Sequence, residues 1–259
     1  MKDTAKEVDF FDRTSKSYLK TYDAENTEGY SFRIRREKVE KLIAGDNEGK
    51  MLLDIGSGPG IMIEIILRNG YNVVAADAAP NMIELTKKQF QGNPKVEFLV
   101  TDARNIRKPD NTYDAATAMG LVEYFEEDDD YYKEMARVIK KNGFLIVTYP
   151  NMFSPWRLFN RVALWIIRPL RKLFGIDTSH KDNNIRHKEY TIGGVKKQLK
   201  KYGFEAESAI YYNFKLIPYP FDNLLGKITV KQSQICEKLD STPFKWFGTA
   251  FIVKARNTN

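Results

Sequence analysis

The chain of 259 residues is poor in the residue types from which thiol and zinc chemistry are built. It has one cysteine, Cys236, and two histidines, His180 and His187. A single cysteine excludes an intramolecular disulfide, and with so few histidines it disfavours a Cys/His zinc site. No apolar run approaches the roughly 20 residues that a helix needs to cross a bilayer. The charged start of the chain also lacks the apolar stretch of a signal peptide. We therefore expect a soluble, cytoplasmic protein without a metal site.

Acidic residues are scarce in one segment only. Residues 151–203 hold twelve Lys and Arg against three Asp and Glu, a net charge of +9. The whole chain carries +7, so the rest of it carries −2. The basic character therefore belongs to this segment and not to the fold as a whole.

The stretch Met51–Gly60, which reads MLLDIGSGPG, predicts a short strand that ends near an acid and enters a glycine-rich turn. Glycine lets the backbone approach a ligand closely, and the helix that follows presents unpaired N–H groups to it. In doubly wound sheets, ligands bind at this carboxyl end of the strands. The stretch therefore predicts a nucleotide-type binding site.

Two features set this stretch apart from the usual dinucleotide-binding turn. Asp54 stands at the end of the strand, one residue before the first glycine, and Ile61 stands where the third glycine of that pattern is expected. Both features disfavour a dehydrogenase. A second predicted strand ends on Asp77, which is placed to bind ribose hydroxyls.

From Met51 onward, strand and helix signals alternate, which predicts an α/β fold with a parallel, doubly wound (Rossmann-like) sheet. We expect strands at 51–55, 72–77, 95–100, 113–119, 143–149, 204–212 and within 244–255, and helices at 8–22, 31–44, 60–69, 80–90, 127–141 and 191–202. Residues 213–243 are expected to be irregular. The acidic run 126–130 is interpreted as a helix start and not as a metal site.

The order of motifs resembles that of the class I S-adenosylmethionine-dependent methyltransferases. LDIGSGPG (53–60) resembles their motif I, VAADAAPNM (74–82) their second motif and FLVTDA (98–103) their third, and EMARVIKKNG (134–143) is similar to the run before their fifth strand. The resemblance points to the small-molecule branch that includes the ubiquinone-pathway enzymes. It implies a seven-stranded, mainly parallel sheet with an antiparallel last strand and a helical lid insertion after strand five.

The same resemblance divides the chain into four parts and assigns its cofactor site. These parts are an N-terminal helical cap (1–45), an S-adenosylmethionine-binding core (46–150), a basic amphipathic lid (151–190) and a C-terminal part with the acceptor pocket (191–259). The implied cofactor-binding residues are Tyr18, Asp54, Gly56, Ser57, Gly58, Gly60, Asp77, Ala78, Met82, Asp102, Ala103 and Met119. One of Arg33, Arg35 and Arg36 is a further candidate, for the cofactor's carboxylate.

Candidates for a general base come from the loops that border the acceptor pocket in this family. Relatives carry Glu-His after the fourth strand, but this chain has Glu123 followed by Tyr124, so the role of that histidine does not transfer. His187 is the first candidate, because a His-x-x-Tyr-Thr run before a helix borders the acceptor in similar enzymes, and His180 is the second. Tyr22 and Glu123 complete the set. A solvated loop histidine is the alternative interpretation.

Residues 156–174 combine bulky apolar side chains with basic ones and contain no acid. Arg157, Arg161, Arg168 and Lys172 recur at helical spacing, so two interpretations are open. The segment either covers the active site with its arginines in water, or lies in the plane of an anionic membrane. Nucleic acid is disfavoured as a partner, because the basic residues are interleaved with large aliphatic ones.

These signals predict an enzyme that methylates an oxygen or nitrogen of a small or lipid-like acceptor, with a peripheral membrane location as an option. The alternatives are a non-catalytic cofactor-binding adaptor at a membrane and a nucleic-acid methyltransferase. The acceptor itself and the oligomeric state do not follow from the sequence.

Overall fold

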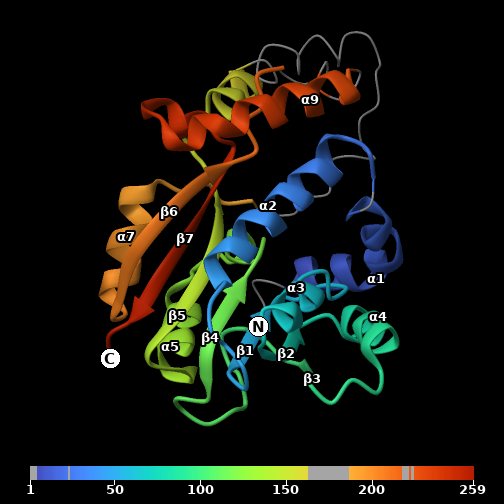
Figure 1. Cartoon of the computed structure of the whole chain (residues 1–259), viewed down its shortest axis with the longest axis vertical. Coiled ribbons are helices and arrows are strands. Elements are labelled where there is room, and N and C mark those ends of the chain that lie inside the picture. The colour runs from blue at the N-terminus through green and yellow to red at the C-terminus, as the bar shows by residue number, and fades with distance from the viewer. Residues whose placement is uncertain (1–4, 23, 163–186, 218–221, 223–224) are drawn as a thin grey trace.

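The computed structural model of the chain describes residues 5–22, 24–162, 187–217, 222 and 225–259 (Figure 1). Its centre is a seven-stranded sheet in the order β3-β2-β1-β4-β5-β7-β6. The parallel strands are β1 (Met51–Ile55), β2 (Asn72–Asp77), β3 (Val96–Val100), β4 (Tyr113–Ala118) and β5 (Ile139–Pro150). β7 (Ala250–Asn257) lies antiparallel between β5 and β6 (Phe204–Tyr212). The predicted fold class is confirmed.

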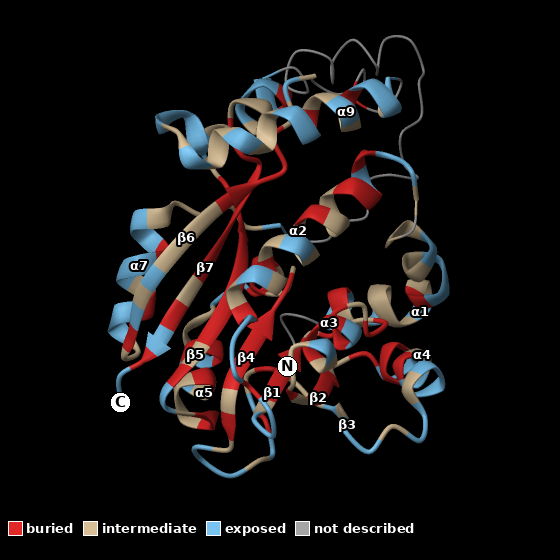
Figure 2. Ribbon diagram, in the orientation of Figure 1, coloured by how far each residue is buried: buried red, intermediate tan, exposed pale blue. Residues whose placement is uncertain are grey.

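Helices bury both faces of this sheet (Figure 2). Successive side chains of a strand point to opposite faces. Leu53 and Ile55 of β1 join the core beneath α5 (Asp129–Val138) and α7 (Ile192–Lys201). Leu52 joins the opposite core, beneath α2 (Thr27–Ile43) and α3 (Ile63–Arg68). Burial on both faces explains why the parallel strands are apolar runs and not alternating patterns.

Two further helices frame the carboxyl end of the sheet. α4 (Pro80–Phe90) packs against β2 and β3. α1 (Ala5–Tyr22) packs against both α2 and α4, although it is far from α4 in the sequence. The expected N-terminal helices are therefore present, and α1 is positioned beside the glycine-rich turn.

Several predicted boundaries are wrong. The helix expected over 60–69 begins at Ile63, because the glycine-rich turn continues to Met62. The helix expected to reach 141 ends at Val138, where β5 begins at Ile139 instead of 143. The last strand begins at Ala250, because the preceding η3 (Pro243–Phe247) is a 3-10 helix.

The expectation that residues 213–243 are irregular is also wrong. They include α9 (Gly226–Cys236) and the 3-10 helix η2 (Glu237–Ser241). The side chains that α9 turns inward are Thr229 and Ser233, so the apolar period that signals a buried helix face is missing from its sequence.

Only part of the predicted lid insertion lies within the described residues. Residues 155–162 are helical, and 163–186 lie outside them, with His180, Arg168 and Lys172. None of the helices in the described part of the chain is long and apolar enough to cross a bilayer.

Candidate active site

The glycine-rich turn is fastened to the neighbouring strand. After β1 the backbone N–H groups of Gly56 and Ser57 both donate to the carbonyl of Ala76, at 2.8 and 3.0 Å. Gly60 has φ +81°, and a Cβ there would lie 2.7 Å from Cγ2 of Thr86, so this position requires glycine. A Cβ on Gly58, by contrast, would meet no atom within 4 Å. Gly58 lines the pocket described next, so its missing side chain leaves room for a ligand.

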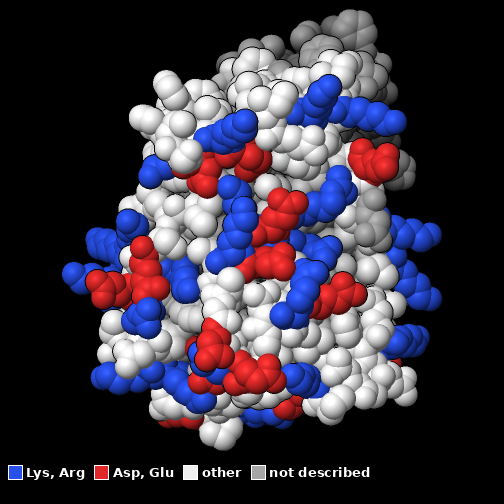
Figure 3. All heavy atoms as spheres, viewed as in Figure 1, with Lys and Arg blue, Asp and Glu red and all other residues white. Residues whose placement is uncertain are grey.

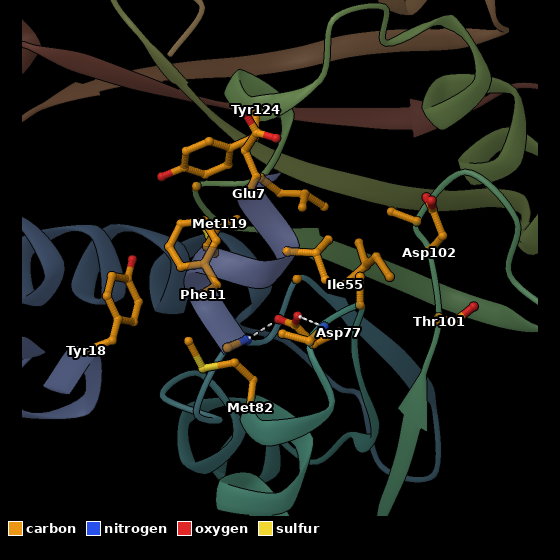
Figure 4. Close-up of a pocket in the computed structure, with 18 of the residues that line it drawn as sticks. Glu7, Phe11, Tyr18, Ile55, Asp77, Met82, Thr101, Asp102, Met119 and Tyr124 are labelled. Carbon is orange, nitrogen blue, oxygen red and sulfur yellow. Dashed lines mark hydrogen bonds between the residues drawn. The ribbon is translucent and has the colours of Figure 1, made fainter. Parts of the chain in front are cut away.

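A pocket of about 770 Å³, including the open solvent at its mouth, lies at this edge of the sheet (Figure 4). Its floor is formed by the turn and by the ends of β2 and β4, and α1 lies across it. Of the residues predicted to bind a cofactor, the pocket is lined by Tyr18, Gly56, Gly58, Asp77, Ala78, Met82, Asp102, Ala103 and Met119. The sequence-derived set therefore converges on one pocket.

Asp77 is held in a fixed orientation at the end of β2. Its Oδ2 accepts the N–H of Gly58 at 2.8 Å and its Oδ1 accepts the N–H of Ala79 at 2.9 Å. A carboxylate can accept more hydrogen bonds than these two. The dashed lines in Figure 4 show these two bonds. Such a carboxylate can accept hydrogen bonds from a pair of ligand hydroxyls.

A second, smaller cavity of about 310 Å³ adjoins the first and shares Tyr22, Gly56 and Met119 with it. Asp54 and Ser57 line it, together with Arg35 of α2. The Oδ1 of Asp54 accepts the Thr117 hydroxyl at 2.8 Å, whereas its buried Oδ2 has no hydrogen-bond partner among the described residues. Burial raises the pKa of Asp54 to about 7. This cavity can therefore hold a group with both a positive and a negative charge, opposite Asp54 and Arg35.

Asp102, at the other end of the pocket, is bound by its neighbour Arg104. Arg104 donates its backbone N–H and its Nε to Oδ1, at 2.9 and 3.0 Å, and its Nη2 to Oδ2 at 2.7 Å. Burial alone would raise the pKa of Asp102, but these bonds outweigh it and lower the pKa. The carboxylate is therefore ionised and fixed in one orientation.

Of the catalytic candidates in the described part of the chain only Tyr22 lines the pocket, and His187 lies beside the lining residue Tyr124. The ring of Tyr124 lies 5.0 Å from that of His187, centroid to centroid. Burial and the charge of Arg157 lower the pKa of His187, so its imidazole is neutral at pH 7. Burial raises the pKa of Tyr22 and of Glu123. Tyr22 is thus a phenol near neutral pH, which suits a hydrogen-bond donor better than a base.

Several pocket residues were not predicted from the sequence. α1 contributes Glu7, Val8 and Phe11, and the segment after β4 contributes Leu121 and Tyr124. Figure 4 shows Glu7 and Phe11 on α1 pointing toward the same space as Tyr124. The sequence predicted an N-terminal helical cap over 1–45, but nothing in it marks Glu7 as buried. Gly60, Glu123 and His187, which were predicted, line neither cavity.

The described residues include no cluster of three or more side chains suited to a metal ion. The site is therefore built from backbone N–H groups, carboxylates and aromatic rings. The buried Oδ2 of Asp54, the space above Gly58 and the oriented Asp77 together fit a ligand with an amino-acid end and a nucleoside end.

Comparisons with known proteins agree with this geometry. Residues 53–147 match the family described as "Methyltransferase domain". The chain is 34% identical over 104 residues to a ubiquinone biosynthesis O-methyltransferase of Schizosaccharomyces pombe, covering 39% of this chain and 38% of that one. It is 31% identical over 150 residues to a demethylmenaquinone methyltransferase of Renibacterium salmoninarum, covering 57% and 60% respectively. The chain therefore spans less than two thirds of these relatives.

The fold extends further than the sequence likeness. The structure of magnesium protoporphyrin IX methyltransferase from Synechocystis PCC 6803, which holds SAH, superposes with a TM-score of 0.62 over 98% of this chain and 99% of that one, at 15% identity. Motifs, sheet order and domain match thus agree: residues 53–147 form a methyltransferase domain with the fold of the S-adenosylmethionine-dependent methyltransferases, and its cofactor is S-adenosylmethionine.

Proposed function

We propose that this protein is an enzyme that transfers the methyl group of S-adenosylmethionine to an oxygen or nitrogen of a small, lipid-like acceptor. The observation that carries this proposal is the continuity of the site. One pocket joins the glycine-rich turn, Asp77 and Asp102 to an aromatic wall at Tyr124, beside the neutral His187. The two relatives named above are, by their names, a ubiquinone biosynthesis O-methyltransferase and a demethylmenaquinone methyltransferase. A quinone-like acceptor is the nearest chemical class.

Different residues of the site would bind different parts of the cofactor. Asp77 would accept the ribose hydroxyls, and Asp102 with Ala103 would contact the adenine edge, with Met82 beside the base. Asp54, Ser57 and Arg35 would hold the amino-acid end, and Arg35 is our choice among the three arginines of α2. When bound, S-adenosylmethionine supplies an activated methyl group on a good leaving group.

The protein's own contribution is to position the acceptor and to exclude water. Phe11, Tyr18 and Tyr124 give the chamber an aromatic lining, and α1 covers it. Proximity and orientation of this kind can supply several kcal/mol of the barrier. A phenolic acceptor also needs a base, and the neutral His187 can take its proton, whereas Glu123 is the second candidate.

Methyl transfer to a panel of phenols, demethylated quinols and amines tests this proposal. Wild-type protein should methylate a phenolic or quinol member, and His187→Ala should lower kcat at least tenfold while cofactor affinity stays unchanged. Because the pKa of His187 is below its usual 6.5, kcat of the wild type should be flat above pH 7. Tight cofactor binding without turnover on any member would instead support a non-catalytic adaptor.

We also propose that the enzyme works in the cytoplasm, at a membrane surface, where lipid-like acceptors are found. The basic segment 156–174 was the predicted contact. In its described part, Arg157 donates to the carbonyl of Thr249 at 2.9 Å, and Arg157 and Arg161 both pair with Glu189. These two arginines are therefore engaged within the protein, and a membrane contact needs other groups.

A further inference from the structure

Large exposed apolar side chains are concentrated at one end of the molecule. Of the eleven in the described part of the chain, Val100 is the only one outside residues 153–246. The other ten are Phe153, Leu158, Phe159, Val162, Leu216, Leu225, Ile228, Ile235, Phe244 and Trp246. Scattered apolar residues are normal on a protein surface, but a cluster of this kind marks an interaction site.

The helix α9 shows this most clearly, because its burial pattern is inverted. The small polar residues Thr229 and Ser233 are buried, at 0% and 1% exposure. Ile228 and Ile235, seven positions apart, are 60% and 64% exposed. Residues at this spacing share one helix face. In a helix that only packs against its own fold, the isoleucines would be turned inward.

Hydrogen bonds join the segments that carry these side chains into one surface. Gln232 of α9 accepts from the N–H of Leu216 and donates to the carbonyl of Phe214. Trp156 donates to the carbonyl of Ile217, and Asn151 donates to the carbonyl of Trp246. The outer face of α9, the outer residues of 153–162 and those of η3 are here called the apical face.

The apical face lies at the same edge of the sheet as the cofactor turn. β5 runs parallel to β4 and β1, and its last residue, Pro150, pairs with Ala250, which also pairs with Tyr212. The segments 151–162 and 213–249 therefore leave the sheet at its carboxyl end. In Figure 1, α9 lies at the end of the molecule opposite the chain's C-terminus.

Along α9, the charged side chains of this face are all basic. Lys227 and Lys231 are exposed there, next to Ile228, and the helix contains no acid. Lys245 is exposed between Phe244 and Trp246 of η3. Figure 3 shows basic side chains among uncharged ones on the visible part of this end. Lysine beside isoleucine, phenylalanine and tryptophan is the composition of a segment that lies in an anionic lipid interface.

We propose that the apical face docks on an anionic lipid surface, with Ile228, Ile235, Phe244 and Trp246 entering the interface and Lys227, Lys231 and Lys245 facing headgroups. This contact is separate from the arginines of 156–174. Its use would be to deliver a lipid-like acceptor to the pocket at the same edge of the sheet. That use rests on the proposed function, whereas the docking itself does not.

Co-sedimentation with vesicles tests the docking directly. The full chain would be mixed with phosphatidylcholine vesicles and, separately, with vesicles made of equal parts of phosphatidylcholine and phosphatidylglycerol. Wild type should pellet with the anionic vesicles only. Lys227→Glu with Lys231→Glu should weaken binding at least tenfold, and Ile228→Gln with Ile235→Gln, which keeps the charge, should do the same. The matched control, Lys196→Glu with Lys197→Glu on exposed positions of α7, changes the net charge equally and should bind like wild type.

Several results would overturn the proposal. These are a wild type that stays in the supernatant, variants of α9 that pellet like wild type, and a control that loses binding as strongly. A wild type that self-associates and is made monomeric by the isoleucine changes, without binding vesicles, would identify a second copy as the partner. Cofactor affinity and thermal unfolding of each variant report its folding. Methyl transfer to a soluble acceptor should be unchanged in all of them, which separates failure of docking from failure of the proposed function.

Discussion

Asp12 of α1 and Asn81 of α4 are joined by a pair of short hydrogen bonds between the two helices that contribute Phe11 and Met82 to the cofactor pocket. Oδ1 of Asp12 accepts the backbone N–H of Asn81 at 2.7 Å, and Oδ2 accepts its Nδ2 at 2.8 Å. A third bond, at 3.3 Å, runs from Nδ2 to the carbonyl of Asp12. Asn81 follows Pro80 at the start of α4, where a carboxylate also meets the positive end of the helix dipole. This contact ties the covering helix to the core.

Breaking that contact should make the cofactor leave faster. The bonds are exposed, so each removal costs about 1 kcal/mol, or roughly fivefold in affinity. Asp12→Ala and Asn81→Ala should each raise the Kd for S-adenosylmethionine by about that factor, mainly through the dissociation rate. Stopped-flow fluorescence or calorimetry would measure it.

A double variant separates this contact from a general loss of stability. Asp12→Ala combined with Asn81→Ala should weaken binding little more than Asp12→Ala alone, since Asn81→Ala removes only the side-chain bonds to Asp12 and keeps the backbone one. Arg13→Ala, which affects only an exposed pair with Asp9 inside α1, serves as the control and should leave the Kd unchanged. Additive effects of Asp12 and Asn81 would contradict the role assigned to their contact.

Cofactor affinity should depend on the ionisation of Asp54. Its pKa is about 7, because the carboxyl is buried, and the ionised form attracts a cationic ligand while the protonated form does not. Between pH 6 and pH 8 the Kd for S-adenosylmethionine should therefore fall by about tenfold. Asp54→Asn should bind weakly throughout and should lack this component of the pH dependence. Parallel titration curves for the two proteins would refute the assignment.

Arg104 is expected to act through Asp102 as a positioning residue. Its guanidinium fixes the carboxylate with two bonds, in addition to one from the backbone N–H, and only arginine has this planar geometry. Arg104→Lys and Arg104→Gln should each raise the Kd for the cofactor by about tenfold, and leave kcat at saturating cofactor near the wild-type value. If kcat falls while the Kd is unchanged, Arg104 does not act on the cofactor.

The sequence was sufficient to predict that the proposed cofactor residues lie close together, because their positions follow from local geometry. Asp54, Asp77 and Asp102 each stand at or just after the end of a parallel strand, so the topology alone brings them to one edge of the sheet. Few other residue types could replace the glycines between them. At Gly60, for example, φ is positive and a Cβ would collide with Thr86. Residue types and order therefore predicted their convergence.

The acceptor half depends on contacts between distant segments, which one sequence does not specify. Glu7 comes within the pocket only because α1 packs on α4, some 70 positions later in the chain. α9 was missed for a different reason. Its buried positions are Thr229 and Ser233, so the usual rule that apolar periodicity marks the inner face gives the wrong answer there.

Stability should decrease as the pH rises through the pKa of Glu237. This carboxyl joins three segments: its Oε1 accepts the N–H of Asn213 at 2.8 Å and the hydroxyl of Tyr30 at 3.4 Å, and Lys38 lies 3.9 Å from its Oε2. Burial, only partly offset by Lys38, raises its pKa from 4.5 to about 7. The folded protein therefore holds this proton more tightly than the unfolded chain does.

A group with a raised pKa in the folded state contributes stability that is complete below the unfolded pKa, here about 4.5, and is lost as the pH rises to about 7. For Glu237 the loss is ~3 kcal/mol at most. Glu237→Gln stays neutral and can still accept the Asn213 N–H, so it should match wild type near pH 4.5 and become more stable than wild type by up to that amount at pH 8. Urea unfolding at both pH values would measure the difference, and a variant that loses stability equally at pH 4.5 and pH 8 would show that Glu237 is ionised in the folded protein throughout.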